Sequence, residues 1–176
     1  MYPHRPQCQN LLQISNIADN CTYENGLFIT TQADFDAFNV SNCVTVYGDI
    51  YFESNETSFM LPSAIKTING SLMLDNAPDL RTISAPTLIA INGSLTIGGT
   101  ASLAVVSFPS LKFVRGIELS ELDSINVSSW ELAVLINASD GTCMVTDTNL
   151  TSVDGLFSLI GSISTLVIRN PSFHLF

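Results

Sequence analysis

The chain has 176 residues, of which 46% are hydrophobic and 12% are charged, and its formal net charge is −10. This length suits a single domain that can bury a substantial core. Asp and Glu outnumber Lys and Arg by 16 to 6. The balance argues against nucleic acid and anionic membrane surfaces as partners, because both require basic patches on the protein. Neutral sugars and protein partners remain open.

Residues 1–20 show no clear pattern, and we expect them to form a loose N-terminal arm. Residues 21–43 are predicted to form a cap. Within it, Thr31 and Asp34 have the spacing of a capping box, and Phe35 and Phe38 then share one face of a short helix. This helix is expected to close the first coil of the domain that follows.

Cys21 and Cys43 lie on either side of that helix. In a secreted chain, two such cysteines are more often joined than free. The sequence therefore predicts a disulfide between Cys21 and Cys43, which would stabilise the cap by about 3 kcal/mol.

The segment 44–119 repeats one pattern with a period in the low twenties, which is typical of a solenoid. Each repeat has two apolar residues separated by one other residue, shortly after a glycine. The pairs are Ile50 and Phe52, Leu72 and Leu74, Leu95 and Ile97, and Ile117 and Leu119. Between them, Leu80-x-x-Ile83-x-x-Pro86-x-Leu88 recurs one period later as Leu103-x-x-Val106-x-x-Pro109-x-Leu111.

The apolar pairs are too short for helices, and Asn-Gly before them indicates a turn followed by a short strand. A leucine-rich horseshoe would place its asparagine one position later than Asn76 and would return through helices, which Pro86 and Pro109 would break. Coils stacked at about 4.8 Å would bury one column of apolar residues. We therefore predict an all-β fold, a right-handed β-helix with coils over residues 44–170 and a short N-terminal capping helix.

The regularity weakens after Leu119. The next pair, Cys143 and Val145, comes later than the period predicts, and Leu166 and Ile168 then restore the usual step. The coil over residues 120–142 therefore contains an insertion, which should form a loop. Its tryptophan, Trp130, is expected to pack over the edge of the coil.

Neither end of the chain shows a recognisable targeting signal. Residues 1–13 lack the apolar run of a signal peptide, and no segment is long enough to span a bilayer. Residues 171–176 follow a predicted strand without a polar cap, although repeat proteins usually close their last coil. We expect that the C-terminal end is truncated and that the chain is a fragment or an incomplete gene product.

The four cysteines contain no Cys-x-x-Cys, and His4 and His174 lie at opposite ends of the chain, so no metal site is predicted. Cys143 takes the first apolar position of its coil and should be a buried, inert thiol. The partner of Cys8 is left open: it is Cys143 if the arm runs along the stack, or a cysteine beyond the C-terminus.

Eight Asn-x-Ser/Thr sequons occur, whereas the composition would give about three by chance, which indicates a secreted glycoprotein. The candidate glycosylation sites are Asn39, Asn55, Asn126, Asn137 and Asn149. Asn20 is less favoured because it adjoins Cys21. Asn69 and Asn92 are less favoured because they should stack in adjacent coils as an asparagine ladder.

The residues directly after the strand pairs are Glu53, Asp75, Gly98 and Ser120. Carboxylates in neighbouring coils are what a β-helix polysaccharide lyase or hydrolase would use for acid–base chemistry or for Ca²⁺. Gly98 and Ser120 interrupt this row, and no nucleophile with a base can be recognised elsewhere. We predict no catalytic, cofactor-binding or metal-binding residue, and therefore no enzymatic activity.

The run from Ile29 to Asp34, followed by Cys43, Gly48, Ile50 and Phe52, resembles the receptor L-domain superfamily. The likeness extends through the repeats from about residue 21 to residue 170. It is strongest to the fungal branch, the GPI-anchored glycoproteins of cell-wall organisation that are similar to sporulation-specific wall proteins of yeasts. The resemblance implies a non-enzymatic surface glycoprotein, held by a lipid anchor after a Ser/Thr-rich tail. The signal peptide, the tail and the anchor signal of that pattern are not visible in this sequence.

The leading hypothesis is a cell-surface glycoprotein that supports fungal cell-wall integrity through a flat β-helix face. Its expected partners are wall glycan or surface proteins, without nucleic acid, and with membrane contact through a GPI anchor in a full-length form. The expected location is extracellular, at the cell surface or wall. Two alternatives remain: a ligand-binding L domain of a signalling receptor, and a β-helix polysaccharide lyase or hydrolase.

Overall fold

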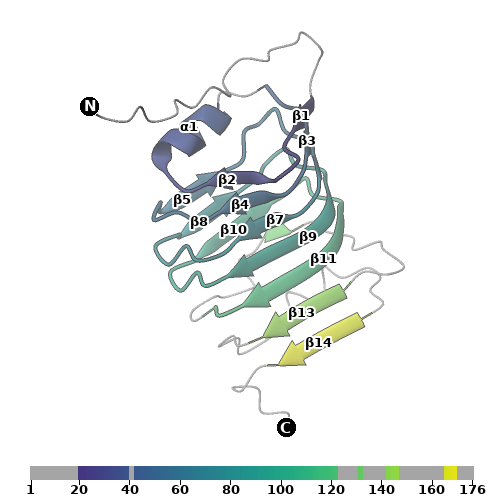
Figure 1. Cartoon of the computed structure of the whole chain (residues 1–176). Coiled ribbons are helices and arrows are strands. Elements are labelled where there is room, and N and C mark those ends of the chain that lie inside the picture. Colours follow the sequence, from purple (N-terminus) through teal and green to yellow (C-terminus); the bar gives the residue numbers. More distant parts are fainter. Residues whose placement is uncertain (1–19, 40–41, 123–130, 133–141, 147–164, 170–176) are drawn as a thin grey trace, which may run out of the picture.

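The computed structural model describes residues 20–39, 42–122, 131–132, 142–146 and 165–169. Their strands form two parallel sheets on a β-solenoid, as the repeat predicts (Figure 1). Sheet A consists of β1 Asn20–Thr22, β2 Leu27–Ile29, β3 Thr45–Tyr47, β4 Ile50–Phe52, β6 Thr67–Asn69, β7 Leu72–Leu74, β9 Ala90–Gly98, β11 Phe113–Ser120, β13 Thr142–Thr146 and β14 Thr165–Arg169. Sheet B consists of β5 Ser58–Met60, β8 Thr82–Ser84, β10 Val105–Phe108 and β12 Glu131–Leu132.

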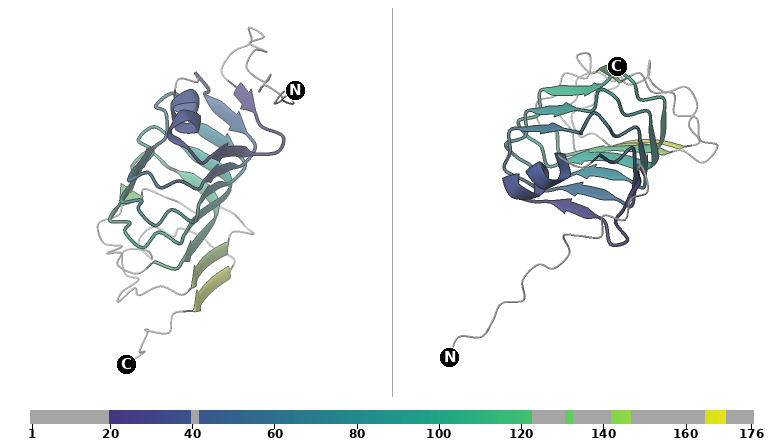
Figure 2. Two further views of the ribbon diagram at one scale, coloured as in Figure 1. Left: turned by 60° about the vertical axis from the view of Figure 1, so that its left-hand side comes forward. Right: turned by 90° about the horizontal axis from the view of Figure 1, so that it is seen from above.

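The register of sheet A follows the sequence repeat residue by residue. Leu72 pairs with Leu95, which pairs with Ile117, and all three are buried. The same column continues through Cys143 to Leu166, so the longer step across the insertion does not disturb the pairing. Successive coils therefore contribute one rung each to a continuous apolar column, and the predicted β-helix is confirmed (Figure 2).

Sheet B contains the second repeated pattern. Ile83 of β8 lies between Phe59 of β5 and Val106 of β10, and all three side chains face the core. Pro86 and Pro109 follow these strands where the chain turns towards sheet A. At this corner the Thr87 hydroxyl donates to the Ser63 carbonyl oxygen at 2.9 Å, which ties one coil to the next.

The Asn-Gly pairs do not form the turns that the sequence predicts. Asn69 ends β6 and Leu72 begins β7 in the same sheet, and in the next coil β9 runs through Asn92 and Gly93 without a break. A Cβ added to Gly70 would collide with the Gly48 carbonyl oxygen of the coil before it. Glycine is therefore needed here because neighbouring coils approach closely at a bend of the sheet, and the positions before it are further strand.

The stack also begins earlier than the repeat suggests. β1 and β2 pair in parallel with β3 and β4, with Cys21 opposite Val46 and Leu27 opposite Ile50. The segment predicted as a cap thus supplies a rung of sheet A as well as a helix. The signal that reveals this rung is the run from Gly26 to Ile29, which lies one repeat before the run from Gly48 to Phe52.

The capping helix α1 spans Gln32–Asn39. The Thr31 hydroxyl accepts a hydrogen bond from the Asp34 amide at 3.2 Å, and the Asp34 carboxylate accepts one from the Thr31 amide at 3.0 Å, so the predicted capping box is present. The Thr31 hydroxyl also donates to the Asp34 carboxylate at 2.8 Å, and this bond, followed by those from Thr30, lowers the pKa of Asp34. Phe38 is buried, and the Phe35 ring meets the Phe59 ring edge-on with their centroids 5.8 Å apart. The helix thus covers the end of the core near sheet B.

Cys21 and Cys43 form the predicted disulfide, with their Cα atoms 5.6 Å apart. It joins the first rung of sheet A to the segment that leads from the helix into β3. The loop it closes contains α1, so the bond fixes both ends of the cap.

Candidate interaction surface

Residues on the outer face of sheet A are positioned by the alternation of the strands. In β4, Ile50 and Phe52 point into the core while Tyr51 between them points outwards and is partly exposed. Because the coils are in register, one outer residue from each rung lies in the same column. From the N-terminal end this column holds Phe28, Tyr51, Met73, Thr96, Glu118, Met144 and Val167.

The first two residues of this column form a stacked aromatic pair. The rings of Phe28 and Tyr51 have centroids 4.6 Å apart and planes only 6° from parallel. A Cβ added to Gly26 would lie 2.6 Å from the Tyr51 ring, so the turn before β2 lies directly against that ring. The Tyr51 hydroxyl donates to the Asp49 carboxylate at 3.3 Å. The pair is therefore held in place by its neighbours, although 51% of Phe28 is exposed.

The environment of Tyr51 raises the pKa of its hydroxyl. The main cause is loss of contact with water, and the negative charge of Asp49 beside it adds to the effect. The Asp49 carboxylate also accepts a hydrogen bond at 2.7 Å from the Ser71 amide in the next coil. Asp49 thus links the outer column to the bend of the sheet.

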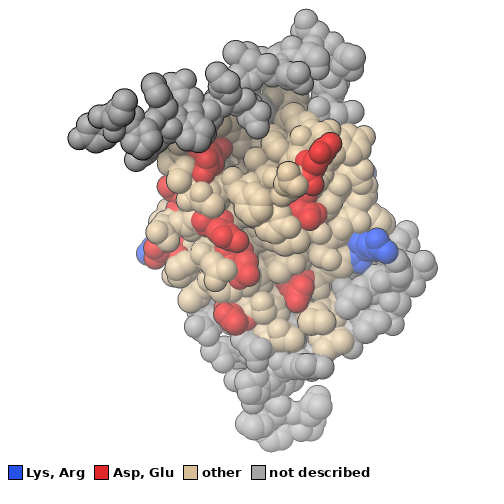
Figure 3. Space-filling view, in the orientation of Figure 1, with Lys and Arg blue, Asp and Glu red and all other residues tan. Residues whose placement is uncertain are grey.

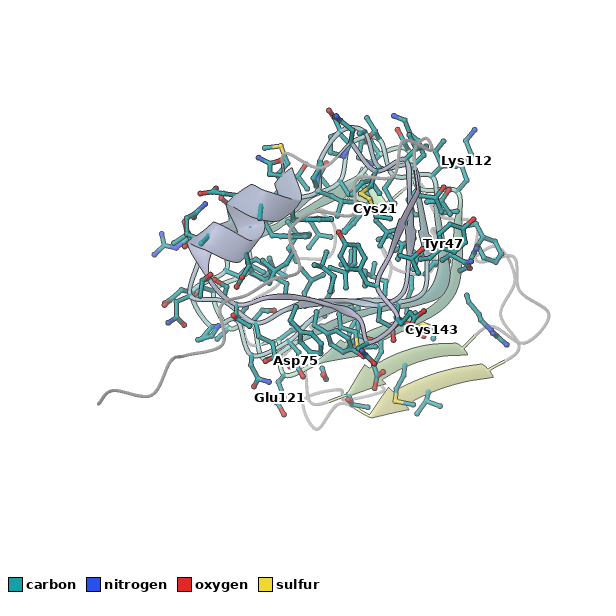
Figure 4. All side chains as sticks on the ribbon, turned by 45° about the horizontal axis from the view of Figure 1, so that its top comes forward. Cys21, Tyr47, Asp75, Lys112, Glu121 and Cys143 are labelled. Atoms are coloured by element: carbon teal, nitrogen blue, oxygen red, sulfur yellow. A yellow bond between two sulfur atoms is a disulfide. The ribbon has the colours of Figure 1, made fainter. Side chains whose placement is uncertain are left out.

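Carboxylates border the outer column. Glu53 follows the end of β4, close to Tyr51 along the chain, and Asp75 holds the equivalent place after β7 in the next rung; both are exposed. Figure 3 shows acidic side chains set into a largely uncharged surface on the side of the molecule seen in Figure 1. Tyr47 and Lys112 lie towards the other end of the strands from Asp75 and Glu121 (Figure 4).

The row that suggested acid–base chemistry is interrupted in space as in sequence. After Glu53 and Asp75, the following rungs supply Gly98, which is buried, and Ser120. The Asp75 carboxylate accepts a hydrogen bond from the Asn76 amide at 2.9 Å and so supports the local turn. In the part of the chain that the structure describes, no three His, Cys, Asp or Glu side chains come together in a way that could hold a metal ion.

The predicted asparagine ladder is confirmed. The Asn92 side-chain amide donates to the Asn69 side-chain oxygen at 3.2 Å, and both residues are exposed on the outer face of sheet A. Their column begins with Thr22 and Tyr47 in the two rungs before them. A glycan on Asn92 would replace one of the two hydrogens on the nitrogen that makes this bond and would crowd Asn69 beside it.

The other predicted glycosylation sites fall in different places. Asn39 is the exposed last residue of α1, and Asn55 is exposed after the end of β4. Asn20 begins β1. Asn126, Asn137 and Asn149 lie outside the described residues, as do Trp130 and Cys8. Asn39 and Asn55 therefore have the accessibility that a glycan requires.

Cys143 is a buried free thiol in the inner column of sheet A, as predicted. Burial raises its pKa from the ordinary value of 9.0 to about 11. The thiol is therefore protonated at neutral pH and poorly placed for reaction.

The outer face of sheet B differs from that of sheet A. Its described residues are mostly small and hydroxylated, with Ser58, Thr82, Ser84 and Ser107 among them. Met60 and Val105 on this face are 58% and 44% exposed, but the described strands place no aromatic residue there. Sheet A is thus the face that carries the exposed aromatic side chains.

The chain matches no protein-family model, no curated protein and no solved structure. Among the helices of the described segments, none has the length and apolar character needed to cross a bilayer. Function must therefore be inferred from the surface itself.

The sequence predicted a flat strand face without naming the residues that distinguish it. Phe28 was missed because its strand lies in the segment assigned to the cap. Tyr51 lies between the two apolar residues of a predicted pair, so its outward direction follows from alternation. The pairing of Phe28 with Tyr51 would have required recognition of the first rung at Leu27 and Ile29.

Proposed function

We propose that this chain is a non-enzymatic domain of an extracellular glycoprotein that organises the fungal cell wall by binding through the outer face of sheet A. Its partners would be wall glycan or other surface proteins, and a GPI anchor in a full-length form would hold it at the membrane. The observation that supports this best is the ordered aromatic pair of Phe28 and Tyr51 on a solvent-facing sheet.

Apolar side chains that adjoin one another on an exposed surface are typical of interaction sites. A rigid sheet also presents its side chains at fixed spacing, so little conformational entropy is lost on binding. The disulfide between Cys21 and Cys43 and the excess of sequons both favour the oxidising secretory route. These features support binding at the cell surface better than chemistry, because the carboxylate row is interrupted at Gly98.

The proposal can be tested with isolated fungal cell walls. The purified glycoprotein should sediment with them, and Phe28→Ser should reduce the bound fraction. Met60→Ser is the matched control, because it also removes an exposed apolar side chain but lies on sheet B. Equal retention of both variants would count against sheet A as the binding face.

A second experiment addresses the role in the cell. Deletion of the gene in its host should sensitise the wall to lytic enzymes, and purified protein should release no sugar from wall polysaccharide. Release of reducing ends or unsaturated sugars would instead identify a lyase or hydrolase. A normal wall after deletion would contradict the proposed role in wall organisation.

A further inference from the structure

Three residues on adjacent rungs of sheet A, Phe28, Tyr51 and Met73, form what we call the outer apolar strip. The fold does not require apolar residues there, because Thr96 and Glu118 occupy the same column on the next two rungs. Burial in the core accounts for the inner residues of these strands but not for the strip. The stacking of Phe28 on Tyr51 stabilises the sheet, as aromatic pairs across strands do, and the exposed half of Phe28 is left available for a contact made by the outer face.

The strip is already ordered in the free protein. The Phe28 and Tyr51 rings are nearly parallel, the Gly26 turn lies against Tyr51, and the Asp49 carboxylate accepts a hydrogen bond from the Tyr51 hydroxyl at 3.3 Å. Stacked rings of this kind present their π-electron surfaces and edges without further loss of rotamer freedom. They suit a planar or cationic group placed against the exposed Phe28 ring.

The charges around the strip determine which charge a partner must carry. Asp49 and Glu53 lie shortly before and after Tyr51 along the chain, and Asp75 and Glu118 border the following rungs. Within the described residues, these outer positions on β2, β4 and β7 include no Lys or Arg, whereas β11 carries the exposed Arg115 as well as Glu118. An anionic partner would be repelled. A neutral partner that covered these carboxylates would desolvate them without supplying an opposite charge, which is unfavourable.

We propose that the outer apolar strip binds a positively charged, extended segment of another protein, through Arg or Lys side chains. A guanidinium or ammonium group would lie against the Phe28 ring as a cation–π contact. Neighbouring cations of the segment would pair with Glu53 and with Glu118 further along the column. This inference rests on the proposed use of sheet A and names the class of partner: a basic protein segment.

The direct test uses a fluorescent dodecapeptide of alternating Arg and Ser, titrated with the purified protein at about 50 mM salt, where charge attraction is only partly screened. Anisotropy should rise to saturation, and the dissociation constant should increase with salt. A matched peptide of alternating Glu and Ser should not bind. Absence of saturable binding by the Arg peptide would overturn the inference.

Variants then locate the contact. Phe28→Ala should weaken binding about tenfold, because it removes the exposed ring. Glu53→Gln combined with Glu118→Gln should weaken binding about fivefold and flatten the salt dependence. Asp79→Asn is an exposed acid in the loop before β8, and Tyr47→Ala removes an aromatic ring outside the strip; each should change affinity less than about twofold. Circular dichroism of each variant checks that it is folded.

The outcomes separate this inference from the proposed function. Equal losses with Asp79→Asn and with the Glu53→Gln and Glu118→Gln double variant would show diffuse charge attraction and overturn the strip as the site. Binding of a neutral glucose hexasaccharide that is lost in Phe28→Ala, with no binding of the Arg peptide, would overturn the cationic partner but retain sheet A as the binding face. If Phe28→Ala changes neither peptide binding nor retention on cell walls, both proposals are wrong.

Discussion

The inner and outer faces of sheet A alternate along the same strands but follow different rules. At the inner position, Ile50, Leu72 and Leu95 are aliphatic and at most 1% exposed. At the outer position that follows each of them, Tyr51 gives way to Met73 and Thr96 in successive rungs. The comparison shows that stacking requires regularity only on the face that excludes water. The other face can change from rung to rung, and it is there that a binding function can be encoded.

The difference between the two faces is tested most directly by truncating one residue on each. Leu72→Ala should lower the free energy of unfolding by about 3 to 4 kcal/mol, because it leaves a cavity between Ile50 and Leu95. Met73→Ala changes the neighbouring, partly exposed position and should cost less than about 1 kcal/mol. Urea unfolding followed by circular dichroism measures both. Equal losses would mean that the outer face is as constrained as the inner one.

The second test concerns the cap, which covers the N-terminal end of the core and is held by the disulfide between Cys21 and Cys43. Cys21→Ala with Cys43→Ala should lower the free energy of unfolding by about 3 kcal/mol, since the disulfide closes a loop with a sequence separation of 22. Thermal and urea unfolding under non-reducing conditions provide the measurement. Reduction of the wild-type protein should reproduce the loss, and unchanged stability in the double variant would contradict the role of the cap.

A pH titration tests whether the inner face stays dry at Cys143. Between about pH 9 and the folded pKa of about 11, the unfolded chain releases the thiol proton while the folded chain retains it. The unfolded state then binds fewer protons, so stability falls as pH rises. At about pH 10.5 the resulting loss of unfolding free energy should reach about 2 kcal/mol.

The contribution of Cys143 can be isolated with Cys143→Ala, because other groups also titrate in this range. The difference in unfolding free energy between wild type and variant should be constant below about pH 8. Above pH 9 the wild type should lose stability relative to the variant, by about 2 kcal/mol at about pH 10.5. A difference that does not depend on pH would show that the thiol is hydrated in the folded protein.

The smallest effect is expected at the corner where the outer face of sheet A ends. Asn76, Gly99 and Glu121 lie at equivalent places in three successive coils and have φ values of 53°, 56° and 52°. Glycine is the residue that adopts this conformation without strain. Glu121→Gly should therefore raise the free energy of unfolding by about 0.5 kcal/mol.

Glu121→Ala is the control for that substitution, because it removes the same charge and keeps the Cβ. It should give no gain in stability. If both variants are stabilised equally, the cause is loss of negative charge at an acidic edge rather than relief of backbone strain.

Much of the fold could be predicted because its cause is local and repeated. The single-repeat step from Leu72 to Leu95 specifies the pairing of their strands, and Thr31 with Asp34 specifies the start of the helix. The Asn-Gly pairs were misread as turns. Their glycines are required by the backbone of the preceding coil, a contact between residues one full repeat apart that no local pattern reports.

The candidate site was less predictable than the fold. Tyr51 could be assigned to the outer face by alternation, whereas its partner Phe28 required the knowledge that residues 27–29 form a rung. The interruption of the acidic row at Gly98 was already visible in the sequence. The ordering of the aromatic pair by Gly26 and Asp49 was not, because it joins a turn, a bend and two strands.

The amino-acid sequence alone determined that the coils stack and where the apolar column runs, because burial of a periodic pattern has one efficient solution. It also indicated which cysteines close the cap, because Cys21 and Cys43 lie on either side of the predicted helix. Tertiary structure decided which outer residues come together. Phe28 is one full coil away from Tyr51 along the chain, and Tyr51 is one full coil away from Met73. Their side chains become neighbours only when each coil is placed in register on the next.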